Sequence, residues 1–164
     1  MDVLPRIRPL SPADLTPALA LVWEVFLEFE APGYADEGVQ EFLRFIDRDT
    51  VAAKLETGGL RLWGCFEGER VVGVVASRAP CHIALLFVRK DRHRQGIARA
   101  LFDAMRTACE VEGPVPEITV NSSPYAVEAY RHLGFVARSD EQVMNGIRFV
   151  PMRWSKAAPE QWAP

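Results

Sequence analysis

The pattern of apolar and polar residues divides the chain into a helical first third and a longer part in which strands and helices alternate. After Ser11-Pro12, apolar residues recur at intervals of three and four, which is the period of one face of an α-helix. This stripe ends at Pro32-Gly33, a strong helix-breaking pair. Similar spacing predicts a second helix over about 36–45 and a short third helix over about 50–56.

The period changes near residue 60 to runs that are typical of β-strands. Apolar runs at 60–66 and 71–76 flank a short polar turn and predict a hairpin. The run 83–88 is apolar at every position, as expected of a central strand that is covered on both faces. The other predicted elements are a strand over 3–9, a helix that begins at Gly96 and is stopped by Gly113-Pro114, a strand over 117–120, a helix over about 124–132 and strands over 135–138 and 147–154. This order predicts an α/β fold with a mixed sheet.

Size and composition favour one globular domain. A chain of 164 residues, 49% hydrophobic and 25% charged, is long enough for a single well-filled core, with a loose tail expected over 155–164. A net charge of −3 argues against a general nucleic-acid binder. No apolar run approaches the roughly 20 residues that span a bilayer, and the first ten residues carry prolines and arginines instead of a signal-peptide core. We therefore expect a cytoplasmic protein without a membrane or nucleic-acid partner.

The cysteines and histidines do not form a metal-binding pattern. The three cysteines Cys65, Cys81 and Cys109 have no Cys-x-x-Cys spacing and lie in apolar stretches, so we interpret them as reduced core residues. The three histidines are scattered along the chain without the spacing of metal ligands. The sequence predicts no metal site.

The segment 88–98 combines the end of a strand, a basic loop and the start of a helix. Unpaired N–H groups and the positive end of the helix dipole make a helix N-terminus a phosphate-binding site. The small residues Gly96 and Ala98 allow a diphosphate to approach the backbone. Neither of the glycine-rich patterns typical of nucleoside triphosphate or NAD sites is present. A basic loop alone would also be compatible with an ordinary solvated connection.

Positions 93–98 resemble the signature Gln/Arg-x-x-Gly-x-Gly/Ala of the GNAT superfamily of N-acetyltransferases. In that superfamily this segment holds the pyrophosphate of coenzyme A (CoA). The resemblance implies that acetyl-CoA is the co-substrate and that the loop binds it through His93, Arg94, Gln95, Gly96, Ile97 and Ala98. His93 stands where the superfamily usually has Gln or Arg, and Arg92 or Arg94 could compensate.

A second segment, 120–135, resembles another pattern of the same superfamily. Asn121 follows the expected fifth strand, and Tyr130 begins the sequence Tyr-x-x-x-Gly-Phe. The resemblance implies that Tyr130 is the general acid that protonates the departing CoA thiolate, while Asn121 and Ser123 border the pantetheine channel. On spacing alone, Tyr130 would be interpreted as a core aromatic residue of its helix.

The resemblance also implies an architecture and a mechanism. The expected fold is a mixed, mostly antiparallel sheet, flanked by helices, in which the parallel fourth and fifth strands splay apart to admit the pantetheine arm. A backbone N–H near Phe87 or Val88 would polarise the thioester carbonyl. The acetyl group would pass directly from thioester to amine in a ternary complex. The alternative function is a non-catalytic acyl-CoA sensor or scaffold.

The acceptor side is less defined by the sequence. The acceptor would be a primary amine on a small molecule or a peptide, and its ammonium group must lose a proton. Glu28 is the candidate base in the predicted site, with Glu30 and His82 as further candidates, although each fits an ordinary surface or structural role. Aromatic residues that are candidates to shape the pocket, or alternatively belong to the core, are Phe26, Phe29, Tyr34 and Phe42. The sequence leaves a homodimer open.

Overall fold

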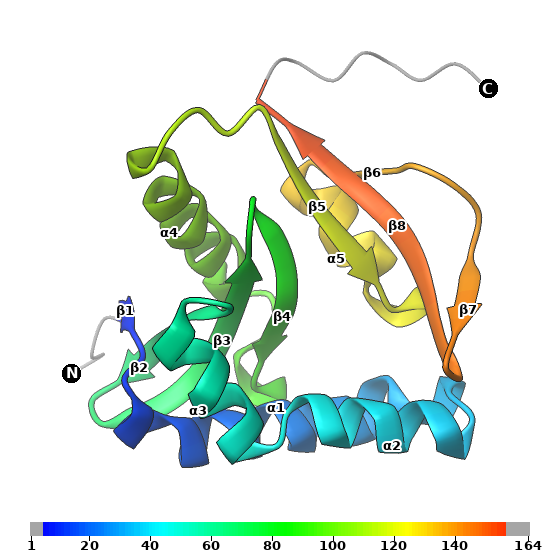
Figure 1. Cartoon of the computed structure of the whole chain (residues 1–164), viewed down its shortest axis with the longest axis horizontal. Helices are drawn as coiled ribbons and strands as arrows, with labels where there is room; N and C mark the ends of the chain where they lie inside the picture. Colours follow the sequence, from blue (N-terminus) through cyan, green and yellow to red (C-terminus); the bar gives the residue numbers. More distant parts are fainter. Residues whose placement is uncertain (1–4, 157–164) are drawn as a thin grey trace.

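A mixed sheet that is open between two of its strands organises the chain (Figure 1). The computed structural model describes residues 5–156. The strands are β1 (Arg6–Pro9), β2 (Arg61–Glu67), β3 (Arg70–Arg78), β4 (His82–Val88), β5 (Glu117–Ser122), β6 (Val136–Ala137), β7 (Gln142–Met144) and β8 (Ile147–Ser155). The helices are α1 (Leu15–Phe29), α2 (Asp36–Phe45), α3 (Arg48–Thr57), α4 (Ile97–Val111) and α5 (Val127–Leu133).

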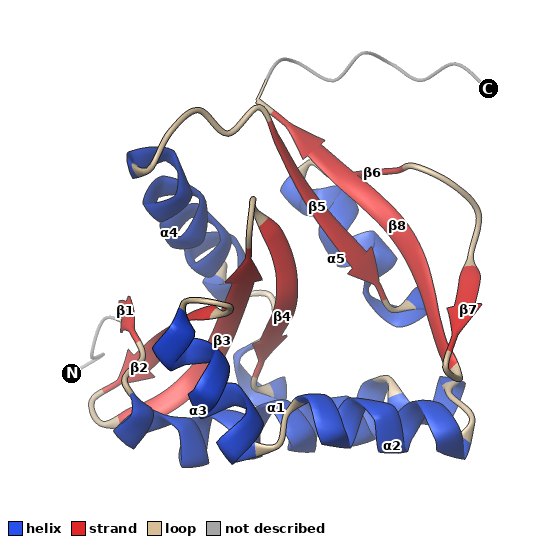
Figure 2. Cartoon of the chain, viewed as in Figure 1, coloured by secondary structure: helices blue, strands red, loops and turns tan. Residues whose placement is uncertain are grey.

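The sheet has the order β1-β2-β3-β4-β5-β8-β6, with β7 paired to β8. All neighbouring strands are antiparallel except β4 and β5, which are parallel. These two strands pair only at His82 with Thr119 and at Ile83 with Val120, and they then diverge (Figure 2). The prediction of a mixed, mostly antiparallel sheet with splayed fourth and fifth strands is confirmed.

Helices cover the sheet on both faces and create two apolar clusters. One cluster contains the buried stripe of α1, which includes Leu15, Val22 and Phe26, each 0% exposed. The other is formed by α4 and α5 against the opposite face of the sheet. Side chains alternate between the two faces along a strand, so Phe87 of β4 belongs to the first cluster while Val88 packs against the second.

The C-terminal part of the chain differs from the sequence prediction in two ways. Strand β7 was not predicted, because its residues are exposed and do not form an apolar run; the Asn145-Gly146 turn that follows it is nevertheless a strong hairpin signal. The tail expected to be loose from 155 begins as ordered structure, since β8 includes Ser155 and the Lys156 N–H donates to the Pro116 carbonyl. Residues 157–164 lie outside the described range.

Smaller differences concern element ends. The predicted strand over 3–9 is observed as β1, and its residues 3 and 4 lie outside the described range. The predicted helix over 124–132 starts with a 3₁₀ turn, Pro124–Ala126, before α5. Within the described part of the chain, no helix is both long and apolar enough to cross a bilayer.

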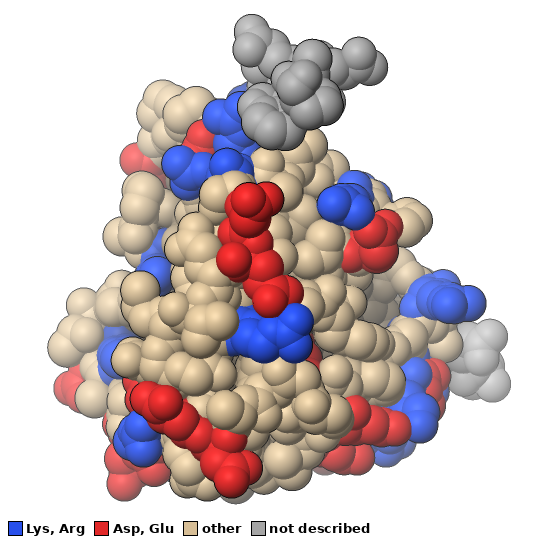
Figure 3. Space-filling model, turned by 90° about the vertical axis from the view of Figure 1, so that its right-hand side faces the viewer, with Lys and Arg blue, Asp and Glu red and all other residues tan. Residues whose placement is uncertain are grey.

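The β7–β8 hairpin lies against the segment between α1 and α2. Arg148 donates to the Gly33 carbonyl at 3.2 Å and also binds Glu141 at 3.0 Å. Figure 3 shows the side of the molecule that carries this hairpin, where basic and acidic groups are interspersed over a mostly uncharged surface. The contact brings residues from both ends of the sequence to one wall beside the sheet opening.

Candidate active site

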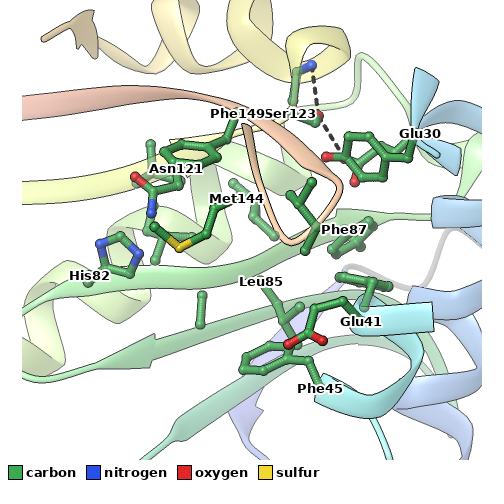
Figure 4. A pocket seen from close by; sticks show the side chains of 18 of the residues that line it. Glu30, Glu41, Phe45, His82, Leu85, Phe87, Asn121, Ser123, Met144 and Phe149 are labelled. Atoms are coloured by element: carbon green, nitrogen blue, oxygen red, sulfur yellow. Dashed lines mark hydrogen bonds between the residues drawn. The ribbon is translucent and has the colours of Figure 1, made fainter. Parts of the chain in front are cut away.

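A cavity of about 320 Å³ lies where β4 and β5 separate (Figure 4). Its walls come from the end of α1, from α2, β4, β5 and α5, and from the β7–β8 hairpin. The cavity brings together eight residues that the sequence suggests for the site: Glu30, Tyr34, Phe42, His82, Phe87, Asn121, Ser123 and Tyr130. The opening of the sheet is therefore the candidate active site.

Tyr130 reaches the cavity from α5, which ends at Gly134 in a left-handed conformation with φ of 103°. Its side chain is 7% exposed, and its ring meets that of Phe135 edge-on at 5.4 Å. Burial, and secondarily the negative charge of Glu30, raise the pKa of the Tyr130 hydroxyl well above its ordinary value. The hydroxyl thus stays protonated at neutral pH. Tyr130 is therefore both a core aromatic residue and a residue that lines the cavity.

Glu30 directly follows α1 and turns its carboxylate into the same cavity (Figure 4). The Ser123 hydroxyl donates to this carboxylate at 3.0 Å and itself accepts from the Ala126 N–H at 3.2 Å. Burial raises the pKa of Glu30 to about 7, although the hydrogen bond from Ser123 opposes the shift. A carboxyl group with a pKa near neutrality is suited to take up a proton during turnover.

Glu28 and His82, the other candidate bases, have different surroundings. The Glu28 carboxylate binds the Lys90 ammonium at 2.6 Å, its side chain is 45% exposed, and it is not among the residues that line the cavity. His82 does line the cavity, at the end away from Glu30 (Figure 4). Its Nδ1 lies 2.8 Å from the Thr119 hydroxyl, and burial together with the charge of Arg78 lowers its pKa to about 4. Of the two glutamates, Glu30 lines the cavity and Glu28 does not.

The free edge of β4 carries polar backbone groups into the opening. The Arg89 N–H donates to the Val72 carbonyl of β3 at 2.9 Å, so the Val88 carbonyl of the same peptide unit points away from β3. There it accepts a hydrogen bond from His93 Nε2 at 2.8 Å, which assigns the ring proton to Nε2. The Val88 N–H lies on the same side as its carbonyl, because both groups of an extended residue face one neighbour. This N–H is available to a group inserted between β4 and β5.

The loop before α4 enters the helix through a glycine in a left-handed conformation. Gly96 precedes the helix with φ of 79° and ψ of 8°, and a Cβ added there would meet no atom within 4 Å. The space that a side chain on Gly96 would fill is therefore open, at the start of a helix whose first N–H groups have no partner within the helix. Of the basic residues, Arg89, Lys90 and Arg92 bind Asp91, Glu28 and Glu67, whereas Arg94 makes no ion pair among residues 5–156. Arg92 thus has a carboxylate partner and Arg94 has none within this range.

The aromatic candidates separate into two groups. Tyr34 and Phe42 line the cavity, whereas Phe26 is 0% exposed in the core and Phe29 stacks on Tyr125 at 5.1 Å. Three further lining residues were not identified from the sequence: Phe45, Met144 and Phe149. Nothing local distinguishes these from ordinary apolar positions, because they reach the cavity only through the contact between α2 and the β7–β8 hairpin.

The cysteines lie outside the cavity. All three are buried free thiols, and the sulfur atoms of Cys81 and Cys109 are 2.9 Å apart. Burial raises the pKa of Cys65 and of Cys81, which disfavours the reactive thiolate. Within residues 5–156, no group of three or more His, Cys, Asp or Glu residues could hold a metal ion.

Comparisons with known proteins agree with this architecture. The family model for the acetyltransferase (GNAT) domain matches residues 30–156. No curated protein matches significantly. Solved structures of similar fold include a GCN5-related N-acetyltransferase from Rhodopseudomonas palustris, with TM-score 0.75 and 23% identity over 92% of this chain and 95% of that one. The PaiA N-acetyltransferase from Thermoplasma acidophilum, in complex with coenzyme A, has TM-score 0.75 and 15% identity over 92% and 98% of the two chains.

A third similar structure is apo YjaB from Escherichia coli, with TM-score 0.70 and 16% identity over 92% of this chain and 97% of that one. These structural similarities support the fold, while the family model covers most of the sequence, including both motif segments. This chain belongs to the GNAT acetyltransferase family.

Proposed function

We propose that the protein transfers the acetyl group of acetyl-CoA directly to a primary amine, with both substrates bound at once. One observation carries this proposal: Tyr130 and Glu30 line the same cavity at the opening of the sheet, the first with a hydroxyl that is protonated at neutral pH and the second with a pKa of about 7. The two groups match the proton transfers that amide formation requires.

The chain offers groups that would bind the pyrophosphate and the pantetheine arm of CoA. The free N–H groups of α4 and the left-handed Gly96 would hold the pyrophosphate, because they combine partial positive charge with close backbone approach. Side chains and backbone of the same loop that complete this site are His93, Arg94, Gln95, Ile97 and Ala98. The pantetheine arm would lie between β4, at Phe87 and Val88, and β5, at Asn121 and Ser123. An N–H placed like that of Val88 can lower the barrier by about 2.7–4 kcal/mol.

The residues of the cavity would move the protons. Glu30 takes one proton from the ammonium group, and the free amine nitrogen attacks the thioester carbon, forming the C–N bond as the C–S bond breaks. Tyr130 gives its hydroxyl proton to the departing thiolate as the C–S bond breaks, a step that requires the hydroxyl to be protonated beforehand. The proton that the nitrogen loses on becoming an amide restores the Tyr130 hydroxyl.

Amine-dependent release of CoA thiol from acetyl-CoA tests the proposal. Initial rates measured while both substrates are varied should give intersecting lines, as expected of a ternary complex, with the acetylated amine found by mass spectrometry. Tight CoA binding without thiol release, for a panel that includes small amines, peptides and aminoglycosides, would contradict the proposal. That result would instead support a non-catalytic acyl-CoA sensor or scaffold.

A further inference from the structure

Part of the cavity is lined by aromatic and other apolar side chains from outside the two motif segments. We call this surface the acceptor wall, and it consists of Tyr34, Phe42, Phe45, Met144, Ile147 and Phe149. Its members come from the turn before α2, from α2 and from the β7–β8 hairpin (Figure 4). None of these segments belongs to the two motifs that resemble CoA-binding sequences, so this wall is free to be specific for the acceptor.

Charged groups in the cavity are few. Arg78 lines the cavity at the end away from Glu30 and makes no ion pair among residues 5–156. Glu41 lines the cavity, but its carboxylate is already bound to Arg44 at 2.6 Å. Glu30 receives only the hydroxyl hydrogen bond from Ser123 and makes no ion pair among residues 5–156. The cavity thus offers one carboxylate that is not neutralised by a neighbouring cation. Since a buried charge needs a partner, this arrangement suits an acceptor with a single ammonium group.

We infer that the acceptor is a small monoamine with an aromatic or similarly apolar body, of the arylalkylamine class. Its amino group would lie at Glu30, and its apolar body would pack on the acceptor wall. Aromatic side chains favour this contact because they bury a large apolar area and pack well edge-to-face or offset against a ligand ring. The inference rests on the proposed function for the chemistry at the nitrogen, whereas the acceptor wall alone determines the preference for an apolar body.

The size of the cavity supports a compact acceptor. Its volume of about 320 Å³ must accommodate the reactive end of acetyl-CoA as well as the acceptor. Ligand sites usually occupy about 300–1,000 Å³, so this cavity is at the lower limit. A polyhydroxylated polycation would find neither the space nor the additional free carboxylates. The competing acceptor is a polyamine. It would be favoured if the ion pair between Glu41 and Arg44 opened, because Glu30 and Glu41 would then offer two carboxylates to two ammonium groups.

Calorimetric titration of three amines into the protein, with CoA present, tests the inference. The probes are 2-phenylethylamine, ethanolamine and spermidine. We expect 2-phenylethylamine to bind at least about 10-fold more tightly than the other two, since even a small apolar group in a fitted pocket is worth roughly 10- to 200-fold. The same amines are then compared as acceptors in the thiol-release assay.

Two neighbouring residues of β7 give a matched pair of variants. Met144 is 63% exposed and lines the cavity, whereas Val143 is 66% exposed and does not. Met144→Ala should weaken the binding of 2-phenylethylamine several-fold and leave the binding of ethanolamine unchanged. Phe149→Ala should weaken the binding of 2-phenylethylamine further. Val143→Ala should behave as wild type in both titrations. Because Met144 is exposed, its replacement tests the wall without endangering the fold.

Each outcome decides between specific alternatives. Equal affinities, tighter spermidine binding, or 2-phenylethylamine binding that ignores Met144 and Phe149 would overturn the inference. Selective 2-phenylethylamine binding without thiol release would leave the inference standing and contradict the proposed acetyl transfer. Thiol release with ethanolamine or spermidine, but not with 2-phenylethylamine, would support transfer and overturn the inferred acceptor class.

Discussion

Gly38 of α2 and Gly146 of the β7–β8 turn touch through their backbones. A Cβ on Gly38 would lie 2.2 Å from the Gly146 carbonyl oxygen, and one on Gly146 would lie 2.6 Å from the Gly38 nitrogen. Such distances require that both positions lack side chains. The contact joins the two segments that supply most of the acceptor wall, so it fixes the shape of the candidate acceptor site from outside the cavity.

Gly38→Ala should therefore destabilise the protein even though alanine favours helices. Overpacking against a backbone typically costs about 1–3 kcal/mol, measurable as a lower free energy of unfolding in urea. We also expect a higher KM for the amine with little change in CoA affinity, because α2 would move relative to the hairpin. Gly33→Ala is the control, since its Cβ would meet only the Arg148 guanidinium, at 3.7 Å. Equal free energies of unfolding of the two variants would show that the contact between Gly38 and Gly146 does not limit side-chain size at position 38.

Gly96→Val tests the proposed pyrophosphate site with an unusually close conformational control. Gly96 has φ of 79° and ψ of 8°, and Gly58, after α3, has φ of 81° and ψ of 7°. Valine at either position should cost about 1–3 kcal/mol of stability, because this backbone conformation is strained for a β-branched residue. Only Gly96→Val should weaken CoA binding in calorimetric titration, since its side chain would enter the space beside α4. Comparable loss of CoA affinity in both variants would contradict the assignment.

The sequence predicts the elements more completely than the site. Helices and strands with buried faces were found because their apolar periods are clear, as in α1, whereas the short exposed strand β7 carries no such period. Both motif segments could be located because each is local in sequence. The sequence names Glu28 as the candidate base and Glu30 as a further one, but it cannot show which of them lines the cavity, since two residues rotate a side chain by about 200° around a helix. Which of the two glutamate side chains faces the cavity depends on where Ser123 and α5 pack. Ser123, which donates to Glu30, is 93 residues away from it in sequence.

Replacement of the cysteines should leave the chemistry intact, because direct transfer needs no acetylated thiol. Cys65→Ala, Cys81→Ala and Cys109→Ala are expected to keep kcat within a few-fold of wild type, although each loses some buried apolar contact. Steady-state rates should still give intersecting lines. Detection of an acetyl-cysteine by mass spectrometry after incubation with acetyl-CoA alone, together with parallel lines, would replace the ternary mechanism with a covalent one.

Glu30→Gln should stabilise the protein above neutral pH while lowering its activity. The Glu30 pKa is raised from 4.5 to about 7, so the folded state resists ionisation that the unfolded state undergoes. The resulting penalty is absent below pH 4.5, grows as pH rises toward 7 and is complete above it, at roughly 3 kcal/mol. Urea unfolding at pH 8 should show the gain in Glu30→Gln, and near pH 4 the variant should match wild type.

Activity and a nearby control complete this test. In wild type, kcat/KM should rise with pH through about 7 as Glu30 becomes able to accept a proton. Glu30→Gln should lose turnover by about 10²- to 10⁴-fold and lose this pH limb. Glu28→Gln, which removes only an exposed ion pair with Lys90, should change stability by less than about 1 kcal/mol and keep the pH profile. If Glu28→Gln lost the pH limb instead, the base would be Glu28.

Tyr130→Phe separates proton donation from packing because it removes the hydroxyl and keeps the ring. The edge-on contact with Phe135 is retained, and the Tyr130 hydroxyl makes no hydrogen bond among residues 5–156, so the free energy of unfolding should remain close to wild type. CoA affinity should also change little. Turnover should fall by about 10²- to 10⁴-fold, the usual contribution of a positioned acid. The measurement is single-turnover acetyl transfer, in which chemistry is followed without product release. An unchanged single-turnover rate would show that Tyr130 is a core residue that merely borders the cavity, and that the thiolate takes its proton from another source.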